Sequence, residues 1–126
     1  MGPIQITSTY EQSYHDQHLD IDFRHKTALL DTKPLGLTRK EYDLLALLIQ
    51  NAGDLVTRET LLLRVWGYGN QIRTRTLDVH ILRLRRKLGE HSGKYIETIF
   101  SVGYRFQPFH APQFVQRQPQ MFALGA

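Results

Sequence analysis

The 126-residue chain contains no cysteine, which excludes a disulfide framework, a cysteine-based zinc centre and a cysteine nucleophile. No apolar run approaches the roughly 20 residues of a membrane-spanning helix, and residues 1–10 lack the features of a signal peptide. The chain also lacks a Gly-x-Ser-x-Gly elbow, a glycine-rich phosphate loop and an isolated carboxylate pair in apolar surroundings. These absences predict a soluble cytoplasmic protein that is not an enzyme and needs no cofactor.

Histidines are the remaining candidates for a metal site, because the chain has six of them. His15 and His18 are the closest pair, on a segment without helical periodicity. No third ligand follows at a spacing typical of zinc sites. The sequence therefore predicts no metal centre.

Positive charge is concentrated in one segment, although the net charge of the whole chain is only +4. Residues 73–87 hold six basic side chains and one acidic one, and the rest of the chain is acidic by one charge. Clustering of this kind is typical of a protein that binds a polyanion. A solvated basic helix is the alternative reading of composition alone.

Hydrophobic periodicity predicts one α+β domain over residues 18–107, in the order sheet, three helices, hairpin. A strand is indicated by Leu19, Ile21 and Phe23 at every second position. A short strand at 27–31, turn residues at 31–34 and a further pairing segment at 35–37 complete a small antiparallel sheet. Residues 1–17 form an arm or linker with at most one weak strand, and the Pro/Gln-rich tail 108–126 is expected to be extended or disordered, with Phe109, Phe114 and Phe122 as anchors.

Two helices are predicted from their caps. Thr38 and Glu41 form a capping box ahead of a helix with an apolar face of Tyr42, Leu45, Leu48 and Ile49. The segment 51–53 ends this helix, with Gly53 free to take the left-handed cap. Thr57 caps the second helix, where Val56 and Leu61 form a hydrophobic staple. The buried face of that helix is predicted to be Leu61, Leu62, Val65 and Trp66.

The third helix, residues 75–88, has its core positions at spacings of 4, 3 and 4 residues: Leu77, Ile81, Leu84 and Leu88. At about 100° per residue, the opposite face carries Arg75, Val79, Leu82, Arg83 and Arg86. Gly89 stops this helix. A polar loop at 90–94, a strand at 95–100, a turn at 101–103 and a strand through Phe106 then predict a β-hairpin.

Several motifs in fixed order resemble the OmpR/PhoB-type DNA-binding domain of bacterial response regulators, over roughly residues 18–107. The matching stretches are LTRKEYDLL at 37–45, VWGY at 65–68, RTLDVHI at 75–81, RLRRKL at 83–88 and GYRF at 103–106. The resemblance implies a winged helix-turn-helix fold with a four-stranded N-terminal sheet and a C-terminal wing. It also implies that the third helix reads the major groove, that the wing reaches the minor groove and that the loop 67–72 contacts RNA polymerase.

Base contacts are expected from the outward face of the third helix. Arg83 matches the family's base-contacting arginine, and arginine bonds guanine O6 and N7 together. Val79 matches an apolar contact to thymine methyl groups. Leu82 departs from the polar or basic residue of many relatives, and it either loses a phosphate contact or alters base preference. Arg86 faces outward as a base or phosphate contact.

Phosphate contacts are implied by the resemblance for four residues: Trp66, Arg75, Thr76 and His80. In the wing, Thr98 and Tyr104 are the further residues expected to bond phosphates. Trp66 has a core role as its alternative. For Arg85, a structural ion pair with Asp78 competes with a DNA contact. The wing departs from the family, since Phe100 and Ser101 occupy the positions of an arginine and a glycine, so the minor-groove arginine is absent there.

The function predicted from these features is sequence-specific binding of double-stranded DNA as a transcription regulator, the output domain of a two-component phosphorelay. The chain has no room for the phosphorylatable receiver domain that precedes this domain in relatives. We therefore expect a monomer that dimerises on DNA. The alternative is a winged-helix module that uses the same face to bind protein.

Overall fold

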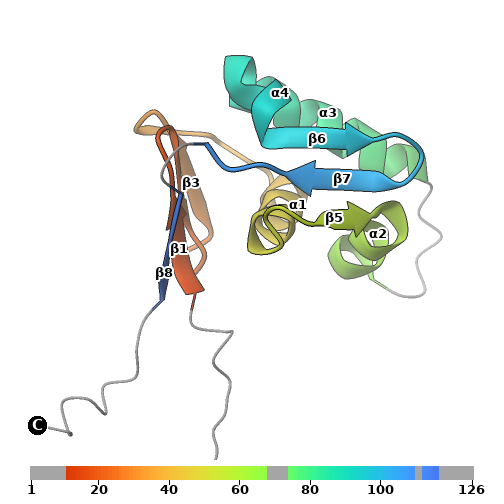
Figure 1. Cartoon of the computed structure of the whole chain (residues 1–126), viewed down its shortest axis with the longest axis horizontal. Helices are drawn as coiled ribbons and strands as arrows, with labels where there is room; N and C mark the ends of the chain where they lie inside the picture. The colour runs from red at the N-terminus through yellow and green to blue at the C-terminus, as the bar shows by residue number, and fades with distance from the viewer. Residues whose placement is uncertain (1–10, 68–73, 110–111, 117–126) are drawn as a thin grey trace, which may run out of the picture.

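The computed structural model describes residues 11–67, 74–109 and 112–116. A five-stranded antiparallel sheet stands beside a helical bundle that carries a second, three-stranded sheet (Figure 1). The first sheet has the order β4-β3-β2-β1-β8, with β1 Glu11–His15, β2 Leu19–Asp22, β3 Thr27–Leu30, β4 Lys33–Pro34 and β8 Gln113–Gln116. The second has the order β5-β7-β6, with β5 Leu55–Thr57, β6 Ile96–Ile99 and β7 Gly103–Phe106. The helices are α1 Arg39–Gln50, α2 Arg58–Trp66, α3 Thr74–Leu88 and the short α4 Ser92–Tyr95.

Strand β4 of the N-terminal sheet begins earlier than the predicted pairing segment at 35–37. Asp31 and Thr32 take positive φ angles of 49° and 70°, and Leu30 pairs with Lys33 across them. Two consecutive positive φ angles define the tight turn whose twist matches antiparallel strands. The turn therefore occupies only two residues, and β4 is Lys33–Pro34 instead of 35–37.

The C-terminal tail contributes a strand that composition did not predict. β8 pairs antiparallel with β1, so the N-terminal sheet has five strands where the family resemblance implied four. Phe114 packs against the buried Tyr14 ring at 4.9 Å between centroids, and Phe109 is half-buried against the core. Both therefore act as the predicted anchors, whereas Phe122 lies outside the described residues.

The predicted caps of α1 and α2 are confirmed. The Thr38 hydroxyl accepts from the Glu41 amide, and the Glu41 carboxylate accepts from the Thr38 amide. The Thr57 hydroxyl accepts from the Thr60 amide at the start of α2. Helix α1 is buried on more than its predicted face, because Leu44 and Leu47 are buried as well.

The segment after α3 is helical rather than a loop. Gly89 ends α3 with a φ of 63° and begins a short 3₁₀ turn, Gly89–His91, which leads into α4. Tyr95 is the last residue of α4, and β6 begins one residue later than predicted. The ring of Tyr95 stacks on Phe106 at 5.4 Å, so α4 is held by packing against the second sheet.

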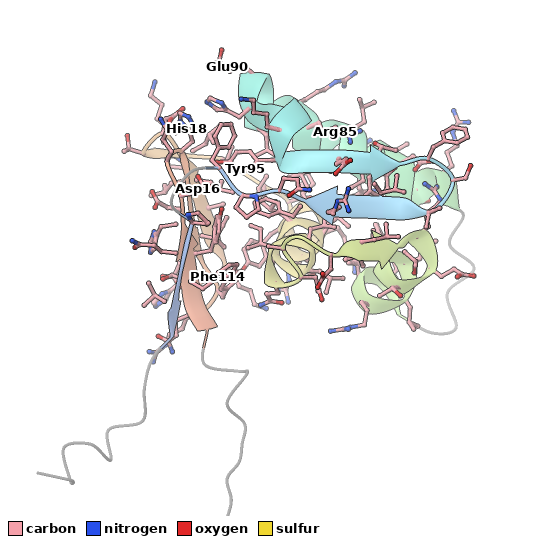
Figure 2. All side chains as sticks on the ribbon, viewed as in Figure 1. Asp16, His18, Arg85, Glu90, Tyr95 and Phe114 are labelled. Atoms are coloured by element: carbon pink, nitrogen blue, oxygen red, sulfur yellow. The ribbon has the colours of Figure 1, made fainter. Side chains whose placement is uncertain are left out.

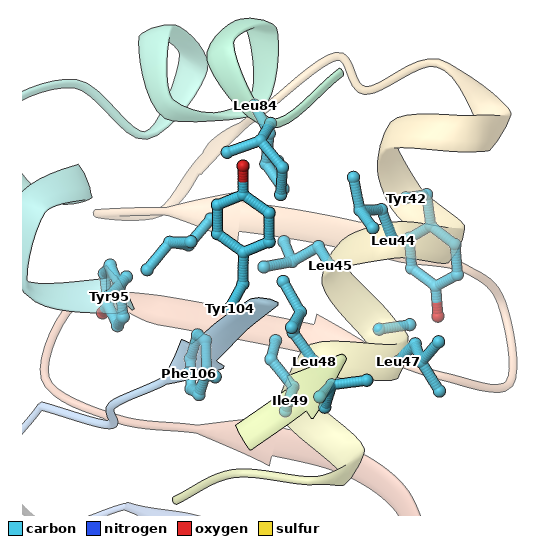
Figure 3. Close-up of a cluster of buried hydrophobic side chains, with 14 of the residues drawn as sticks. Tyr42, Leu44, Leu45, Leu47, Leu48, Ile49, Leu84, Tyr95, Tyr104 and Phe106 are labelled. Atoms are coloured by element: carbon cyan, nitrogen blue, oxygen red, sulfur yellow. The ribbon is translucent and has the colours of Figure 1, made fainter. Parts of the chain in front are cut away.

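The hydrophobic core lies between α1, α3 and β7 (Figure 3). The four residues of the predicted stripe on α3 are fully buried: Leu77, Ile81, Leu84 and Leu88. Leu45 and Leu48 of α1 and Phe106 of β7 meet them in the same cluster. Packing of this stripe fixes which face of α3 remains outside. Within the described residues, no helix has the length and apolar character needed to span a bilayer.

Strand β7 approaches β5 so closely that Gly103 has no room for a side chain. A Cβ atom there would lie 2.1 Å from the Val56 carbonyl oxygen. We expect Gly103→Ala to lower the free energy of unfolding by about 2–3 kcal/mol, because a backbone atom has to move. Urea unfolding followed by circular dichroism measures the change. Gly93→Ala is the control, since a Cβ at Gly93 meets nothing within 4 Å, and equal stability of the two variants would contradict the prediction.

Candidate nucleic-acid interface

The outward face of α3 carries exposed arginines around two apolar side chains. Arg75, Arg83 and Arg86 are exposed, as the helical periodicity predicts. Leu82 is 50% exposed on the same face, and Val79 is half-buried. Arg83 and Arg86 form no hydrogen bond or ion pair with any described residue. Their guanidinium groups are therefore available to an external acceptor.

Other basic side chains of α3 serve the fold. Arg85 donates through Nη2 to the Ile96 carbonyl (2.8 Å) and to Thr98 Oγ1 (2.7 Å), and its guanidinium lies 5.7 Å from the Tyr104 ring centroid. The alternative ion pair between Arg85 and Asp78 is wrong. Arg85 instead fastens α3 to the second sheet, and Figure 2 places it beside β6.

Lys87 is held by a buried carboxylate. Its ammonium donates to Glu41 Oε1 at 2.5 Å and to the Gly36 carbonyl at 3.0 Å. Glu41 is only 2% exposed. Burial raises the pKa of its carboxyl, but hydrogen bonds from Lys87 and from the Thr38 amide outweigh burial and keep that pKa below its ordinary value. The capping box of α1 thus also secures the end of α3.

Asp78 joins α2, α3 and the wing. Arg58 binds its carboxylate with two parallel contacts, Nη1 to Oδ1 at 2.8 Å and Nη2 to Oδ2 at 2.9 Å. The Tyr104 hydroxyl donates to Asp78 Oδ1 at 2.8 Å. The Arg58 guanidinium holds the pKa of Asp78 below its ordinary value, so the carboxylate stays charged. Sequence reasoning missed Arg58, because nothing in the local pattern at the start of α2 points to a partner in α3.

A shallow hollow of about 300 Å³ opens on the outward face of α3, lined by Arg75, Thr76, Val79, His80 and Arg83. The His80 ring bonds through Nδ1 to the Thr76 carbonyl at 2.8 Å. Trp66 meets that ring edge-on at 4.9 Å between centroids. The packing and the hydrogen bond together fix the orientation of the imidazole.

The wing is the β6–β7 hairpin, and its tip is apolar. Phe100 is 89% exposed and Val102 is 41% exposed. Ser101 between them takes a φ of 64°, a conformation that glycine adopts without strain. Thr98 is exposed but already accepts from Arg85, and Tyr104 is buried. The two wing residues predicted to contact phosphate are therefore both occupied within the protein.

The loop predicted to contact RNA polymerase, 67–72, lies outside the described residues apart from Gly67. Arg73, which belongs to the basic segment, also lies outside them. Of the ten predicted DNA contacts, six line one face of α3: Arg75, Thr76, Val79, His80, Leu82 and Arg83. Arg86 continues that face. Trp66 contacts the His80 ring edge-on from α2. The wing residues Thr98 and Tyr104 lie on the second sheet.

Comparison with known proteins gives the same family in sequence and in structure. The family model described as "Transcriptional regulatory protein, C terminal" matches residues 32–106. The transcriptional regulatory protein YclJ of Bacillus subtilis is 44% identical over 87 residues, which cover 68% of this chain and 38% of that protein. The regulator VxrB of Vibrio cholerae is 42% identical over 90 residues, 71% of this chain and 36% of VxrB. The chain thus spans well under half the length of these relatives.

Solved structures agree. The response regulator DrrB of Thermotoga maritima, an OmpR/PhoB homologue, superposes with a TM-score of 0.70 at 36% identity, covering 76% of this chain and 44% of DrrB. The DNA-binding domain of RstA from Klebsiella pneumoniae, solved in complex with the RstA box, superposes with a TM-score of 0.69 at 29% identity, covering 78% of this chain and 99% of that domain. The chain belongs to the family of C-terminal domains of transcriptional regulatory proteins, the OmpR/PhoB-type winged-helix DNA-binding domains of response regulators.

Proposed function

We propose that this domain binds specific double-stranded DNA sequences as a transcription regulator, with α3 in the major groove and the wing near the minor groove. The observation that carries the proposal is the sorting of charge on α3. Arg85 and Lys87 are bound within the protein, whereas Arg83 and Arg86 stand free beside exposed Leu82. Free arginines alone would keep the helix soluble. The exposed apolar side chains among them therefore favour a binding surface.

In this proposal Arg83 and Arg86 read base edges, and Val79 and Leu82 pack against thymine methyl groups. Arginine suits this role because its planar fork can donate two parallel hydrogen bonds to one guanine. Leu82 adds apolar contact without charge. The preferred site should accordingly combine guanine with thymine on the strand that faces α3.

Phosphate contacts are assigned to Arg75, Thr76 and His80 at the start of α3. The His80 Nδ1–H donates to the Thr76 carbonyl, which leaves Nε2 as the ring nitrogen for a phosphate contact. Phosphate contacts by Trp66, Thr98 and Tyr104 remain predictions. For Tyr104 such a contact would require its hydroxyl to leave Asp78.

The wing in this proposal contributes apolar contact through Phe100 and Val102. Apolar side chains in the minor groove pack against sugars or wedge between base steps. Such contacts add affinity without releasing counterions. We propose further that the domain is the output domain of a two-component phosphorelay and dimerises on DNA. The loop 67–72 would contact RNA polymerase. The likeness to response regulators supports these proposals.

The salt dependence of DNA binding tests the proposal against the protein-interaction alternative. A labelled pool of random duplexes should bind at low salt, with log K falling by about 0.9 per phosphate neutralised as log salt rises. Arg75→Ala should remove one phosphate contact and so make the slope of log K against log salt shallower by about 0.9. Arg24→Ala is the control, since Arg24 is an exposed arginine in the β2–β3 turn. Absence of binding to any duplex at low salt would leave only the protein-interaction function. Selection from the same pool would yield the target sequence.

A further inference from the structure

Three potential metal ligands from distant parts of the sequence converge beside the N-terminal sheet. His18 lies directly before β2, Asp31 begins the β3–β4 turn, and His91 ends the 3₁₀ turn after α3. His18 Nδ1 lies 2.6 Å from Asp31 Oδ1, and His91 Nε2 lies 3.4 Å from Asp31 Oδ2. Figure 2 shows His18 at the end of the sheet that faces the α4 end of the bundle, where Glu90 is labelled.

The two histidine side chains are largely enclosed, whereas the Asp31 side chain between them is 53% exposed. The His18 side chain is 21% exposed and that of His91 is 16% exposed. Phe109 packs edge-on against both rings, at 4.9 Å and 5.4 Å between centroids. This packing limits where the two imidazoles can point, so their convergence on one carboxylate is built into the fold.

The donor set suits a borderline divalent cation. Imidazole nitrogen together with carboxylate oxygen is the ligand combination of zinc and its neighbours, whereas magnesium and calcium prefer oxygen alone. Glu90 is a neighbouring surface carboxylate: its side chain is 86% exposed, and its Oε2 lies 3.8 Å from His91 Nε2. The carboxylate of Asp31 supplies negative charge, which favours a divalent cation. Lys94, three residues after His91, is directed over Phe109 at 5.4 Å from its centroid.

The geometry requires only local adjustment. One donor atom from each of the three residues lies within 4.8 Å of the others, whereas ligands of a tetrahedral zinc ion at about 2.0 Å lie roughly 3.3 Å apart. The two imidazoles stack at 3.9 Å between centroids with an interplanar angle of 21°. Each ring has to rotate about its side-chain bonds so that one nitrogen lone pair of each imidazole points at the same metal ion. The nitrogen that coordinates the metal must carry no proton, so in a neutral ring the proton moves from the nitrogen that faces Asp31 to the other ring nitrogen.

We propose that His18, Asp31 and His91, completed by Glu90 or water, form a binding site for a divalent transition-metal ion of the zinc class. The three ligands come from the N-terminal sheet and from the turn that ends α3. An ion there would cross-link the sheet to the end of the DNA-facing helix. The proposal does not depend on DNA binding.

Titration of the tag-free chain with Zn²⁺ and Co²⁺ tests the site. We expect one equivalent of Zn²⁺ to bind by calorimetry, an increase in Tm with metal because only the folded chain assembles the ligands, and visible absorption of four-coordinate Co²⁺. Excess Mg²⁺ should produce none of these effects. Failure of the unmodified chain to bind either transition metal would overturn the proposal.

Variants locate the ion. His18→Gln, His91→Gln and Asp31→Asn should each abolish the Tm increase and the Co²⁺ absorption. His25→Gln is the matched control, because His25 also bonds an aspartate, Asp22 at 2.8 Å, but lies in the exposed β2–β3 turn. Circular dichroism establishes that each variant is folded, and the exposed Asp31 is the mildest substitution. Unchanged binding in the folded Asp31→Asn and His91→Gln variants would place the ion elsewhere and refute the site.

Discussion

Replacing Asp16 with alanine should lower the free energy of unfolding by about 4 kcal/mol, because it strips two buried hydroxyl groups of their acceptor. The Asp16 carboxylate accepts from Tyr14, from Tyr95 at 2.6 Å and from the Phe109 amide at 3.3 Å. It also accepts from two amides at the start of β2. Tyr14 and Tyr95 are fully buried, so water cannot replace the lost bonds. Figure 2 shows Asp16 and Tyr95 where the two halves of the fold meet.

Urea unfolding of the variant, followed by circular dichroism, measures this loss. Asp22→Ala is the control, since within the described residues the Asp22 side chain bonds only to its neighbours Arg24 and His25 in the β2–β3 turn. The control should change stability by less than about 1 kcal/mol. An Asp16→Ala variant as stable as the control would show that the tyrosine hydroxyl groups find other acceptors.

The same carboxylate should make stability dependent on acid. Burial raises the pKa of Asp16, but hydrogen bonds from Tyr14, Tyr95 and two backbone amides outweigh burial, and the pKa lies below its ordinary value. A folded-state pKa below the unfolded one stabilises the protein above the unfolded pKa of about 4. This contribution should decrease as the pH falls from there through the folded pKa. The Asp16→Ala variant should lack this part of the pH dependence.

Arg83→Ala should reduce sequence preference by about fivefold to 150-fold, since a bidentate guanine contact contributes about 1–3 kcal/mol of discrimination. Its guanidinium is exposed beside the hollow on α3 and makes no bond within the described residues. The loss should appear as weaker binding to the selected site with little change for random duplexes. Fluorescence anisotropy with both DNA types measures the ratio.

Arg75→Ala provides the contrast, because Arg75 is assigned to the phosphate backbone at the first turn of α3. It should weaken binding to the selected and random duplexes by the same factor, and leave their ratio unchanged. An equal loss of preference in both variants would contradict the division between base and phosphate contacts. Both side chains are exposed, so neither substitution should disturb the fold.

Local signals in the sequence were sufficient for the helices and for the exposed face of α3. The capping box at Thr38 and Glu41 depends on neighbouring residues, and the structure contains both bonds. The 4-3-4 stripe likewise predicted which side of α3 is buried. Charge counts could not separate Arg83 from Arg85, because both belong to one basic run. Only the three-dimensional structure shows that the Arg85 guanidinium is bound within the protein, by the Ile96 carbonyl.

Features that depend on distant pairing were missed. Strand β8 forms because Phe114 and its neighbours find β1, and a proline- and glutamine-rich tail carries no local sign of that partner. The helical segment 92–95 is held by the stacking of Tyr95 on Phe106. For the same reason the spacing of the histidines was uninformative. His18 meets His91 across the fold, whereas its neighbour His15 bonds Asp20 on a different strand pair.

The pairing of β1 with β8 brings the first and the last described strand of the fold side by side. Glu11, where β1 begins, pairs with Gln116, where β8 ends, and paired antiparallel residues lie about 5 Å apart. The polypeptide therefore enters and leaves the domain through adjacent positions on one sheet (Figure 1). A domain with this arrangement can be inserted into a surface loop of another protein with little distortion of either partner. It can equally be circularly permuted by joining these two strands and opening the chain at an exposed turn.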